Sequence, residues 1–408
     1  MNSSSAETVA NIEELLQQIL VRLPALSVLR FKCVSKHWLS LISTPQFCHL
    51  HTLQNPNPKI SGFFASSTYC STFIPLQNQS GTTNPFNALN DFVHADDPDT
   101  LGLDILQSCN GLFLCRHRVV PFLCHHRVAD LRKRHPVYVV NPTTNQFSVL
   151  SSPRVGKDPF FIRYALAFDP SKSPHYKVVC LDDHQIDIYS SETRAWKLLE
   201  TSFKTEDWGS SREGGVYCNG AVHWIRDHTQ LVDRWVRDDS DVLHYYVIGE
   251  DSLRLAVSSP PLVVTAPYSD CFSRIPDHRY FGESGSHLCL IDIYWGRNSN
   301  TQFYVKEMRR DYSGWFVKYH VDLNPLISFS RRFWFLLLGV VENDEEDQHH
   351  QNEEEGSSSL LLHIPGKVIP YSLRNKSYKI SVDLPKEDQH YFIPKEHCHG
   401  YVESLACV

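Results

Sequence analysis

The sequence predicts a mainly β protein with a small α-helical module at its N-terminus. Apolar residues recur at helical spacing over residues 11–52, and from residue 108 onward short β-type runs alternate with turn signals. A chain of 408 residues can hold one such module and one large β domain. We therefore predict a disordered N-terminus over 1–10, helices over 11–52, a linker with variable strands or loops over 53–104, and a β domain over 105–408.

Three short amphipathic helices are expected before residue 48. The first has an apolar face at the spacing i, i+3, i+4, i+7, i+8 and i+11, formed by Ile12, Leu15, Leu16, Ile19, Leu20 and Leu23. Asn11 is placed to cap it with Glu14 as the N3 partner, Pro24 ends it, and further apolar residues follow until Pro45. A unit of about forty residues without metal or disulfide is marginal alone, so this apolar surface indicates an interface.

A set of residues in the helical segment stands at the spacing of a known motif. The set comprises Glu14-Leu15-Leu16, Ile19-Leu20, Arg22-Leu23-Pro24, Leu29-Arg30-Phe31, Cys33-Val34, Lys36, Trp38 and Ser43-Thr44-Pro45-Gln46-Phe47. It resembles the F-box, by which substrate adaptors dock onto the Skp-type subunit of a cullin ubiquitin ligase. One departure is that Asn11-Ile12 replaces the Leu-Pro pair that usually opens the motif.

The resemblance implies a set of residues for binding the Skp-type partner, some facing the partner and some holding the helices together. The set is Leu15, Leu16, Ile19, Leu20, Leu23, Pro24, Leu29, Phe31, Val34 and Trp38. The alternative is a three-helix cap packed on the β domain, which would also bury these faces. The Pro-rich linker over 54–58 favours the docking interpretation, because it separates the two parts.

The β region repeats a unit with two halves. One half is a tight turn before an apolar strand, as at Asn110-Gly111, Asn219-Gly220, Ser284-Gly285-Ser286 and Ser357-Ser358-Ser359. The other half is a strand, a polar turn and a large apolar residue, with turn centres near Asn145, Thr193, Asp251, Ser313 and Lys376. These centres recur at about fifty to sixty residues, close to the kelch-like period, which predicts a β-propeller-like domain of about five to seven four-stranded blades.

A propeller has to close, and we expect the last strand, Gly400–Leu405, to pair with an early blade. An irregular pair of β-sandwiches is the alternative topology. The stretch Glu342–Ser359 is acidic and has no apolar residue, so we expect a disordered loop between two strands of the last blade.

Several phrases between about residues 105 and 405 resemble, in this order, the plant F-box-associated interaction domain. They include Ser108-Cys109-Asn110-Gly111-Leu112, Asn141-Pro142-Thr143-Thr144, Ala167-Phe168-Asp169-Pro170, Tyr189-Ser190-Ser191, Gly215-Val216-Tyr217-Cys218-Asn219-Gly220 and His223-Trp224. This resemblance implies a propeller-like domain for substrate recognition, usually in plants.

Other candidate sites are weaker. Cys124-His125-His126 and His397-Cys398-His399 lack the paired C-x2-C spacing of a structural zinc site, so neither a metal nor a cofactor is expected. There is no G-x-S-x-G elbow and no G-x-x-x-x-G-K loop. We interpret Asp182-Asp183 and Asp238-Asp239 as turn residues, and the basic run 127–134 as a solvated loop.

Five tryptophans invite a binding-platform interpretation, but their fixed places in the repeat favour packing between blades: Trp196, Trp224, Trp295, Trp315 and Trp334. The net charge of −7 suggests no nucleic-acid or membrane partner. The 12 cysteines show no disulfide rhythm, and we expect neither a secretory signal nor a spanning helix. Free thiols and a location in the nucleus, the cytoplasm or both are therefore expected.

These observations together predict a non-catalytic substrate-recognition adaptor of an SCF-type ubiquitin ligase. The F-box would dock on a Skp-type subunit and, through it, on cullin and RING subunits, while the β domain would hold a target protein through residues that the sequence does not identify. Two alternatives remain: an F-box scaffold or carbohydrate-binding module acting outside the ligase, and a β-domain enzyme with a helical cap.

Overall fold

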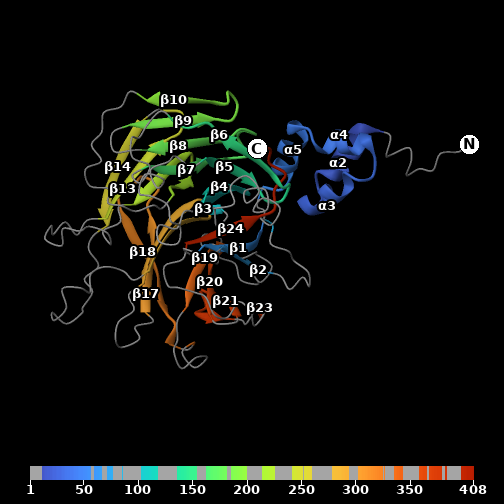
Figure 1. The fold of residues 1–408 in the computed structure, drawn as a ribbon. Helices are drawn as coiled ribbons and strands as arrows, with labels where there is room; N and C mark the ends of the chain where they lie inside the picture. Colours follow the sequence, from blue (N-terminus) through green and yellow to red (C-terminus); the bar gives the residue numbers. More distant parts are fainter. Residues whose placement is uncertain are drawn as a thin grey trace, which may run out of the picture.

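The protein is described here by a computed structural model. The ranges that the structure describes are 12–56, 59–66, 71–76, 85, 103–117, 136–153, 162–181, 185–199, 214–225, 241–250, 252–259, 278–293, 302–324, 326, 335–342, 358–364, 367–378, 382–383 and 397–408. In these ranges a helical module precedes a β domain, and the module lies at one side of that domain, near the C-terminus (Figure 1).

The helical module contains four helices in the described ranges, not the three expected. They are α2 (Glu13–Leu20), α3 (Ala25–Phe31), α4 (Lys36–Ile42) and α5 (Pro45–Gln54). Pro45 begins the fourth helix, because a proline at the first helical position sacrifices no hydrogen bond. The expected cap by Asn11 is wrong, since Ile12 occupies the N-cap position of α2 and makes no side-chain capping bond.

The β domain is a six-bladed β-propeller of antiparallel sheets, within the predicted range of five to seven blades. The sheet orders are β3-β4-β5-β6, β10-β9-β8-β7, β11-β12-β13-β14, β15-β16-β17-β18, β19-β20-β21-β22 with β23 on β21, and β2-β1-β24. The bounds are β1 (Ile60–Ser66), β2 (Ser71–Pro75), β3 (Leu103–Cys109), β4 (Leu112–His117), β5 (Val137–Asn141), β6 (Gln146–Leu150), β7 (Arg163–Ala167), β8 (Lys177–Leu181), β9 (Ile186–Ser190), β10 (Ala195–Leu199), β11 (Val216–Cys218), β12 (Ala221–Ile225), β13 (Asp241–Val247), β14 (Ser252–Ser259), β15 (His278–Ser284), β16 (His287–Ile293), β17 (Gln302–Met308), β18 (Trp315–Asp322), β19 (Leu336–Glu342), β20 (Ser358–Ile364), β21 (Lys367–Ser372), β22 (Ser377–Tyr378), β23 (Val382–Asp383) and β24 (His397–Val402).

The ring closes through a sheet that combines both ends of the chain. Each sheet meets the next through β3, β7, β11, β15, β19 and β24, and β24 in turn contacts β3. Strand β24 pairs antiparallel with β1, with Phe63 opposite Gly400, which confirms the predicted pairing of the last strand with an early blade. The β domain therefore begins at Ile60: strands β1 and β2 lie within 53–104, which was predicted as a linker with variable strands or loops, and the boundary expected at 105 is not where the β domain starts.

The predicted tight turns have the backbone geometry that their residues favour. Asn110 and Gly111 have φ of 48° and 85°, and Asn219 and Gly220 have φ of 50° and 82°, which is the left-handed pair that type I′ hairpins require. Asn145 also has a positive φ, 54°, in the predicted turn between β5 and β6. The Asn and Gly residues of these turns therefore predicted the hairpins correctly.

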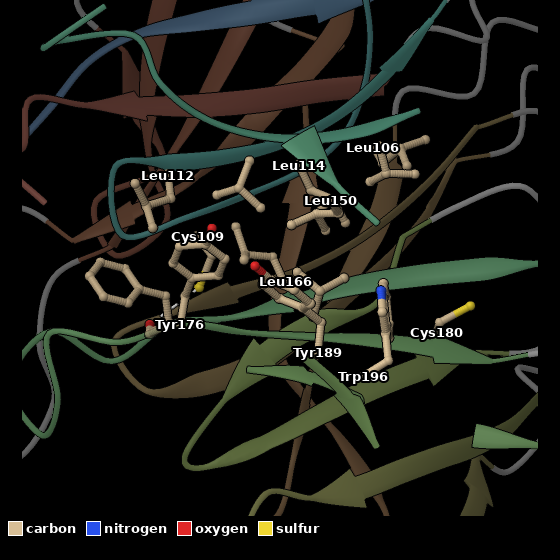
Figure 2. Close-up of a cluster of buried hydrophobic side chains, with 14 of the residues drawn as sticks. Leu106, Cys109, Leu112, Leu114, Leu150, Leu166, Tyr176, Cys180, Tyr189 and Trp196 are labelled. Carbon is tan, nitrogen blue, oxygen red and sulfur yellow. Dashed lines mark hydrogen bonds between the residues drawn. The ribbon is translucent and has the colours of Figure 1, made fainter. Parts of the chain in front are cut away.

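Apolar side chains from neighbouring sheets interlock to form the core. Figure 2 shows one such cluster, with Leu112 and Leu114 of β4 facing Leu166, Tyr189 and Trp196 from the next sheet. The indole Nε1 of Trp196 donates a hydrogen bond to Ser151 O at 2.7 Å, so the ring also ties two blades together.

Trp224 and Trp315 are likewise buried, which confirms blade packing for the described tryptophans. Trp295 and Trp334 lie outside the described residues.

The acidic segment has narrower bounds than expected. Glu342 is the last residue of β19, while Ser358 and Ser359 already belong to β20, so the Ser357–Ser359 turn and the loop bounds 342–359 are wrong. Residues 343–357 lie outside the described residues. Among the helices that the structure describes, none is long and apolar enough to cross a membrane.

Candidate functional site: the exposed face of the helical module

Helix α2 carries two apolar stripes with different surroundings. Leu16 and Leu20, one turn apart, are 3% and 1% exposed. The adjacent stripe is Ile12, Leu15 and Ile19, with exposed fractions of 39%, 40% and 49%. Because one turn of helix separates the members of each stripe, each forms a continuous face. The chain therefore buries one face of α2 and leaves the other to solvent.

The buried face belongs to a compact core. Leu16 and Leu20 pack with Val28, Ile42 and Phe47 and further apolar residues from all four helices. Local caps help to position these helices: Ser35 Oγ accepts from Trp38 N at 3.2 Å, and Thr44 Oγ1 accepts from Phe47 N at 3.1 Å. The core thus uses its own apolar residues and does not need the exposed stripe.

The residues predicted to bind the partner divide by burial. Leu16 and Leu20 are buried; Leu23, Leu29, Phe31 and Trp38 are half-buried; Leu15, Ile19, Pro24 and Val34 are exposed. Phe31 and Trp38 contact each other edge to face, with centroids 5.5 Å apart. Leu26 and Leu39, which the sequence analysis did not include in the set, are exposed by 38% and 46% and extend the apolar surface.

Helix α5 holds the turn between α2 and α3. The ring of His51 is bonded through Nε2 to Leu23 O at 2.8 Å, and Asn55 Nδ2 donates to Val21 O at 2.8 Å. Desolvation lowers the pKa of His51, so the ring is neutral near pH 7 and its Nε2–H is the donor. Asn55 was expected in the linker, but here its side chain is part of the helical module.

The C-terminal segment anchors the helical module to the propeller. Leu405 is 2% exposed and belongs to the core of the helical module. On either side of it, Ser404 O and Ala406 O accept hydrogen bonds from Asn141 Nδ2 at 3.0 and 2.8 Å. Thr143 Oγ1 accepts from Ser404 N at 3.1 Å. The helical module is therefore packed on the β domain through this segment, while its stripe of Ile12, Leu15 and Ile19 remains exposed.

Glu403 makes a second link between the two parts. Its carboxylate accepts from Leu26 N–H at the start of α3 and from Ser61 Oγ of β1, the latter at 3.5 Å. Burial raises the pKa of Glu403, and the contacts to Leu26, Ser61 and Arg30 partly offset this rise. Sequence reasoning missed Asn141, Glu403 and Leu405 as a unit, because their partners are distant in the chain.

A pocket of about 460 Å³ lies at this junction. Lys32 and Cys48 of the helical module, Asn145 of the β5–β6 turn, and Cys407 of the C-terminal segment are among its lining residues. In the part of the chain that the structure describes, no cluster of His, Cys, Asp and Glu is arranged to hold a metal ion.

The weaker candidate sites fall in two groups. His397, Cys398 and His399 are the first three residues of strand β24, where they pair with Ser66, Ala65 and Phe64 of β1. Four segments lie outside the described residues: 124–126, 127–134, 182–183 and 238–239.

Family comparisons agree with the two-part architecture. A model of the F-box domain matches residues 13–50, and a model of the F-box associated beta propeller domain matches residues 64–246. The second match begins inside β1, which supports placing β1 in the propeller.

Proteins of Arabidopsis thaliana are similar to this chain. F-box protein At5g07610 is 29% identical over all of this chain and 94% of its own length. F-box/kelch-repeat protein At3g23880 is 31% identical over 52% of this chain and 57% of its own length. Putative F-box protein At1g47790 is 29% identical over 52% of this chain and 53% of its own length. The chain belongs to the F-box proteins of the plant type, in which an F-box domain precedes an F-box-associated β-propeller.

Proposed function

We propose that the protein is a non-catalytic substrate-recognition adaptor of an SCF-type ubiquitin ligase. It docks on a Skp-type subunit through the exposed apolar face of the helical module and, through that subunit, on cullin and RING subunits. The propeller holds the target protein. The observation that carries this proposal is the exposed stripe of Ile12, Leu15 and Ile19, which lies beside a core that is complete without it.

The energetics favour a partner over solvent for this face. Burying an exposed Leu or Ile side chain completely is worth about 1.5–3 kcal/mol, and Leu15, Ile19 and Val34 still expose 40%, 49% and 57%. Association consumes several kcal/mol of that gain, so several such residues have to contribute together. Leu26 and Leu39 provide further exposed apolar area on α3 and α4.

The adaptor accelerates ubiquitin transfer by position rather than by chemistry. A target held on the propeller is kept close to a conjugating enzyme on the same assembly, so transfer becomes effectively intramolecular. This mechanism requires a defined orientation of the propeller relative to the docking face. Leu405, inserted in the helical core, and Asn141, bonded around it, supply such an orientation.

The docking claim is tested with the full chain and a purified Skp-type subunit. The double variant Leu15→Asp, Ile19→Asp places two charges on the exposed stripe and leaves Leu16 and Leu20 in the core. We expect binding, measured by calorimetry, to weaken more than about hundredfold, since each buried charge costs several kcal/mol. Leu53→Asp is the matched control, because Leu53 is also helical and 44% exposed but lies outside the motif.

Equal binding by the double variant and the parent, with unchanged circular dichroism, would refute docking through this face. The adaptor role has a further test: the Skp-bound protein is mixed with the cullin and RING subunits, and assembly is measured by light scattering. A chain that binds the Skp-type subunit but excludes the cullin would instead support the scaffold alternative.

A further inference from the structure

Two cysteines meet where the helical module joins the propeller. Cys48 lies on α5 and is 7% exposed, and half-buried Cys407 lies on the segment after β24. Both side chains belong to the core cluster of the helical module, where Cys48 Sγ donates to Ile42 O at 3.8 Å and lies within hydrogen-bonding reach of the Cys407 thiol. A disulfide places its sulfur atoms about 2 Å apart, so the two sulfurs have to approach each other for the bond to form.

The junction pocket gives a small reagent access to this pair. Cys48 and Cys407 both line the pocket of about 460 Å³, together with Lys32 and Asn145. That volume exceeds the space occupied by a few solvent molecules, so a molecule the size of water or hydrogen peroxide fits beside the sulfurs.

The surroundings give the two thiols different roles. The hydrogen bond from Cys48 and the nearby Lys32 ammonium lower the pKa of Cys407, although burial opposes them. The hydrogen bond to Cys407, followed by burial, raises the pKa of Cys48. Since the thiolate is the nucleophilic form of cysteine, Cys407, which is the more exposed of the two and lies near the Lys32 ammonium, is the better placed to attack.

Other cysteines in the described ranges have a different environment. Burial raises the pKa of Cys109, Cys115, Cys218 and Cys289, which keeps these thiols protonated inside the propeller. Cys33 is exposed on the helical module. Cys33 therefore serves as a comparison: its thiol is exposed to reagents, but it does not line the junction pocket.

We propose that Cys48 and Cys407 form a peroxide-sensitive dithiol site, which hydrogen peroxide entering the junction pocket oxidises to a disulfide between α5 and the C-terminal segment. This site is independent of the docking face and of the proposed ligase function. In a reducing compartment the pair rests as thiols, and the disulfide is a transient state that thiol exchange reverses.

The oxidation proceeds in two balanced steps. The Cys407 thiolate attacks one peroxide oxygen, the O–O bond breaks, and the departing hydroxide takes a proton to become water, leaving a sulfenic acid on Cys407. The Cys48 sulfur then attacks the Cys407 sulfur, the S–O bond breaks as the S–S bond forms, and the departing hydroxide takes the Cys48 proton as a second water. The two sulfurs together lose two electrons, which the peroxide gains.

The experiment maps disulfides in the full, folded chain after treatment with hydrogen peroxide. Remaining thiols are alkylated, and the protein is cut with trypsin and a glutamate-specific protease. Cleavage after Lys36 and Lys59 isolates Cys48, and cleavage after Glu403 separates Cys407 from Cys398. We expect a linked peptide pair of Cys48 and Cys407, lighter by two hydrogen atoms than the reduced pair and at least about tenfold more abundant than any other cysteine pair.

Three variants sharpen the assignment. Cys407→Ser abolishes the linked pair, and Cys33→Ser, the matched control in the same module, leaves it unchanged. Cys48→Ser stops the reaction at the sulfenic acid of Cys407, which dimedone traps. Oxidation of Cys33 or Cys398 while Cys48 and Cys407 remain fully alkylatable would overturn the proposal. The peptide map of the unsubstituted chain decides this even where a variant fails to fold.

Discussion

Asn141 fixes the position of Leu405, although the residues flanking Leu405 are 263 and 265 positions away from it in the chain. The side-chain nitrogen Nδ2 of Asn141 donates to the backbone carbonyls of Ser404 and Ala406, immediately before and after Leu405, at 3.0 and 2.8 Å. Asn141 is 0% exposed, so these bonds are shielded from water. The last residue of β5 therefore determines where the helical module receives the Leu405 side chain, which couples it to the β domain.

Replacing Asn141 with alanine is expected to free the C-terminal segment. Two buried carbonyls would lose their donor, and the side-chain oxygen that accepts from Thr143 N at 2.9 Å would also be lost. We expect a loss of about 2–4 kcal/mol in the local free energy of opening. Hydrogen exchange at the amides of Ser404 and Ala406 measures this loss, since faster exchange reports segment opening.

The matched control for Asn141 is Gln146→Ala, an exposed residue that begins strand β6 beyond the same turn. Its substitution should leave exchange at Ser404 and Ala406 unchanged. If the amides of Ser404 and Ala406 exchange at equal rates in the Asn141→Ala and Gln146→Ala variants, the side chain of Asn141 does not hold the C-terminal segment.

Two glycines in equivalent turns provide a second test of this junction. Gly111 and Gly220 have similar φ, 85° and 82°, so an alanine at either position costs roughly 1–2 kcal/mol of backbone strain. A Cβ at Gly111 would clash with Ser404 Cβ, whereas nothing lies within 4 Å of a Cβ at Gly220.

Gly111→Ala is therefore expected to destabilise the protein by about 1–3 kcal/mol more than Gly220→Ala, because only the former overpacks the C-terminal segment. Urea unfolding of the two variants measures the difference. Equal midpoints would mean that the segment after β24 moves away from Gly111 at no cost.

His223 is expected to make the propeller sensitive to acid. Its ring packs against the stacked pair of Tyr245 and Tyr312; Nδ1–H donates to Val216 O at 3.1 Å, and Nε2 accepts from Tyr312 OH at 2.7 Å. Burial lowers the pKa of His223 to about 4 from 6.5. Between these pH values the unfolded chain binds the proton and the folded chain does not, so stability falls as pH falls.

The shift of pKa sets the size of this effect. It corresponds to a loss of at most about 3 kcal/mol between pH 6.5 and 4. The variant His223→Asn cannot take up the proton, so its unfolding free energy should decline less steeply over this window in urea titrations at successive pH values. Parallel pH profiles for the variant and the parent would contradict a neutral buried ring. His363 contributes with the same sign, because burial lowers its pKa to about 4 as well.

Local chemistry explains what the sequence could predict. Asn110-Gly111 and Asn219-Gly220 predicted hairpins correctly, because left-handed backbone is a property of those residues themselves. Helical spacing likewise predicted the apolar face of α2, and the structure divides that face into a buried and an exposed stripe. Thr44 and Pro45 carried the signal for α5, a capping residue followed by a proline at the first helical position, but Pro45 was interpreted as the end of the last apolar helix.

Contacts between distant segments explain what the sequence could not predict. The place of strand β1 in a sheet depends on pairing with β24, close to the C-terminal end of the chain. The bonds from Asn141 to the C-terminal segment are polar contacts without any periodic signature. Asn141 was noticed only as part of a family phrase, so its role as an anchor required the three-dimensional structure.

Leu405→Ala tests whether the junction orients the two parts. The substitution leaves a cavity in the core of the helical module and should cost about 2–4 kcal/mol of stability there. The exposed stripe of α2 is untouched, so affinity for a purified Skp-type subunit should change less than about threefold. The orientation of the propeller should become broader, which small-angle X-ray scattering of the Skp-bound complex detects as a larger maximum dimension. Leu53→Ala, on the exposed side of α5, is the control and should scatter like the parent. An unchanged scattering profile for Leu405→Ala would show that Glu403 and the bonds from Asn141 hold the orientation without the buried leucine.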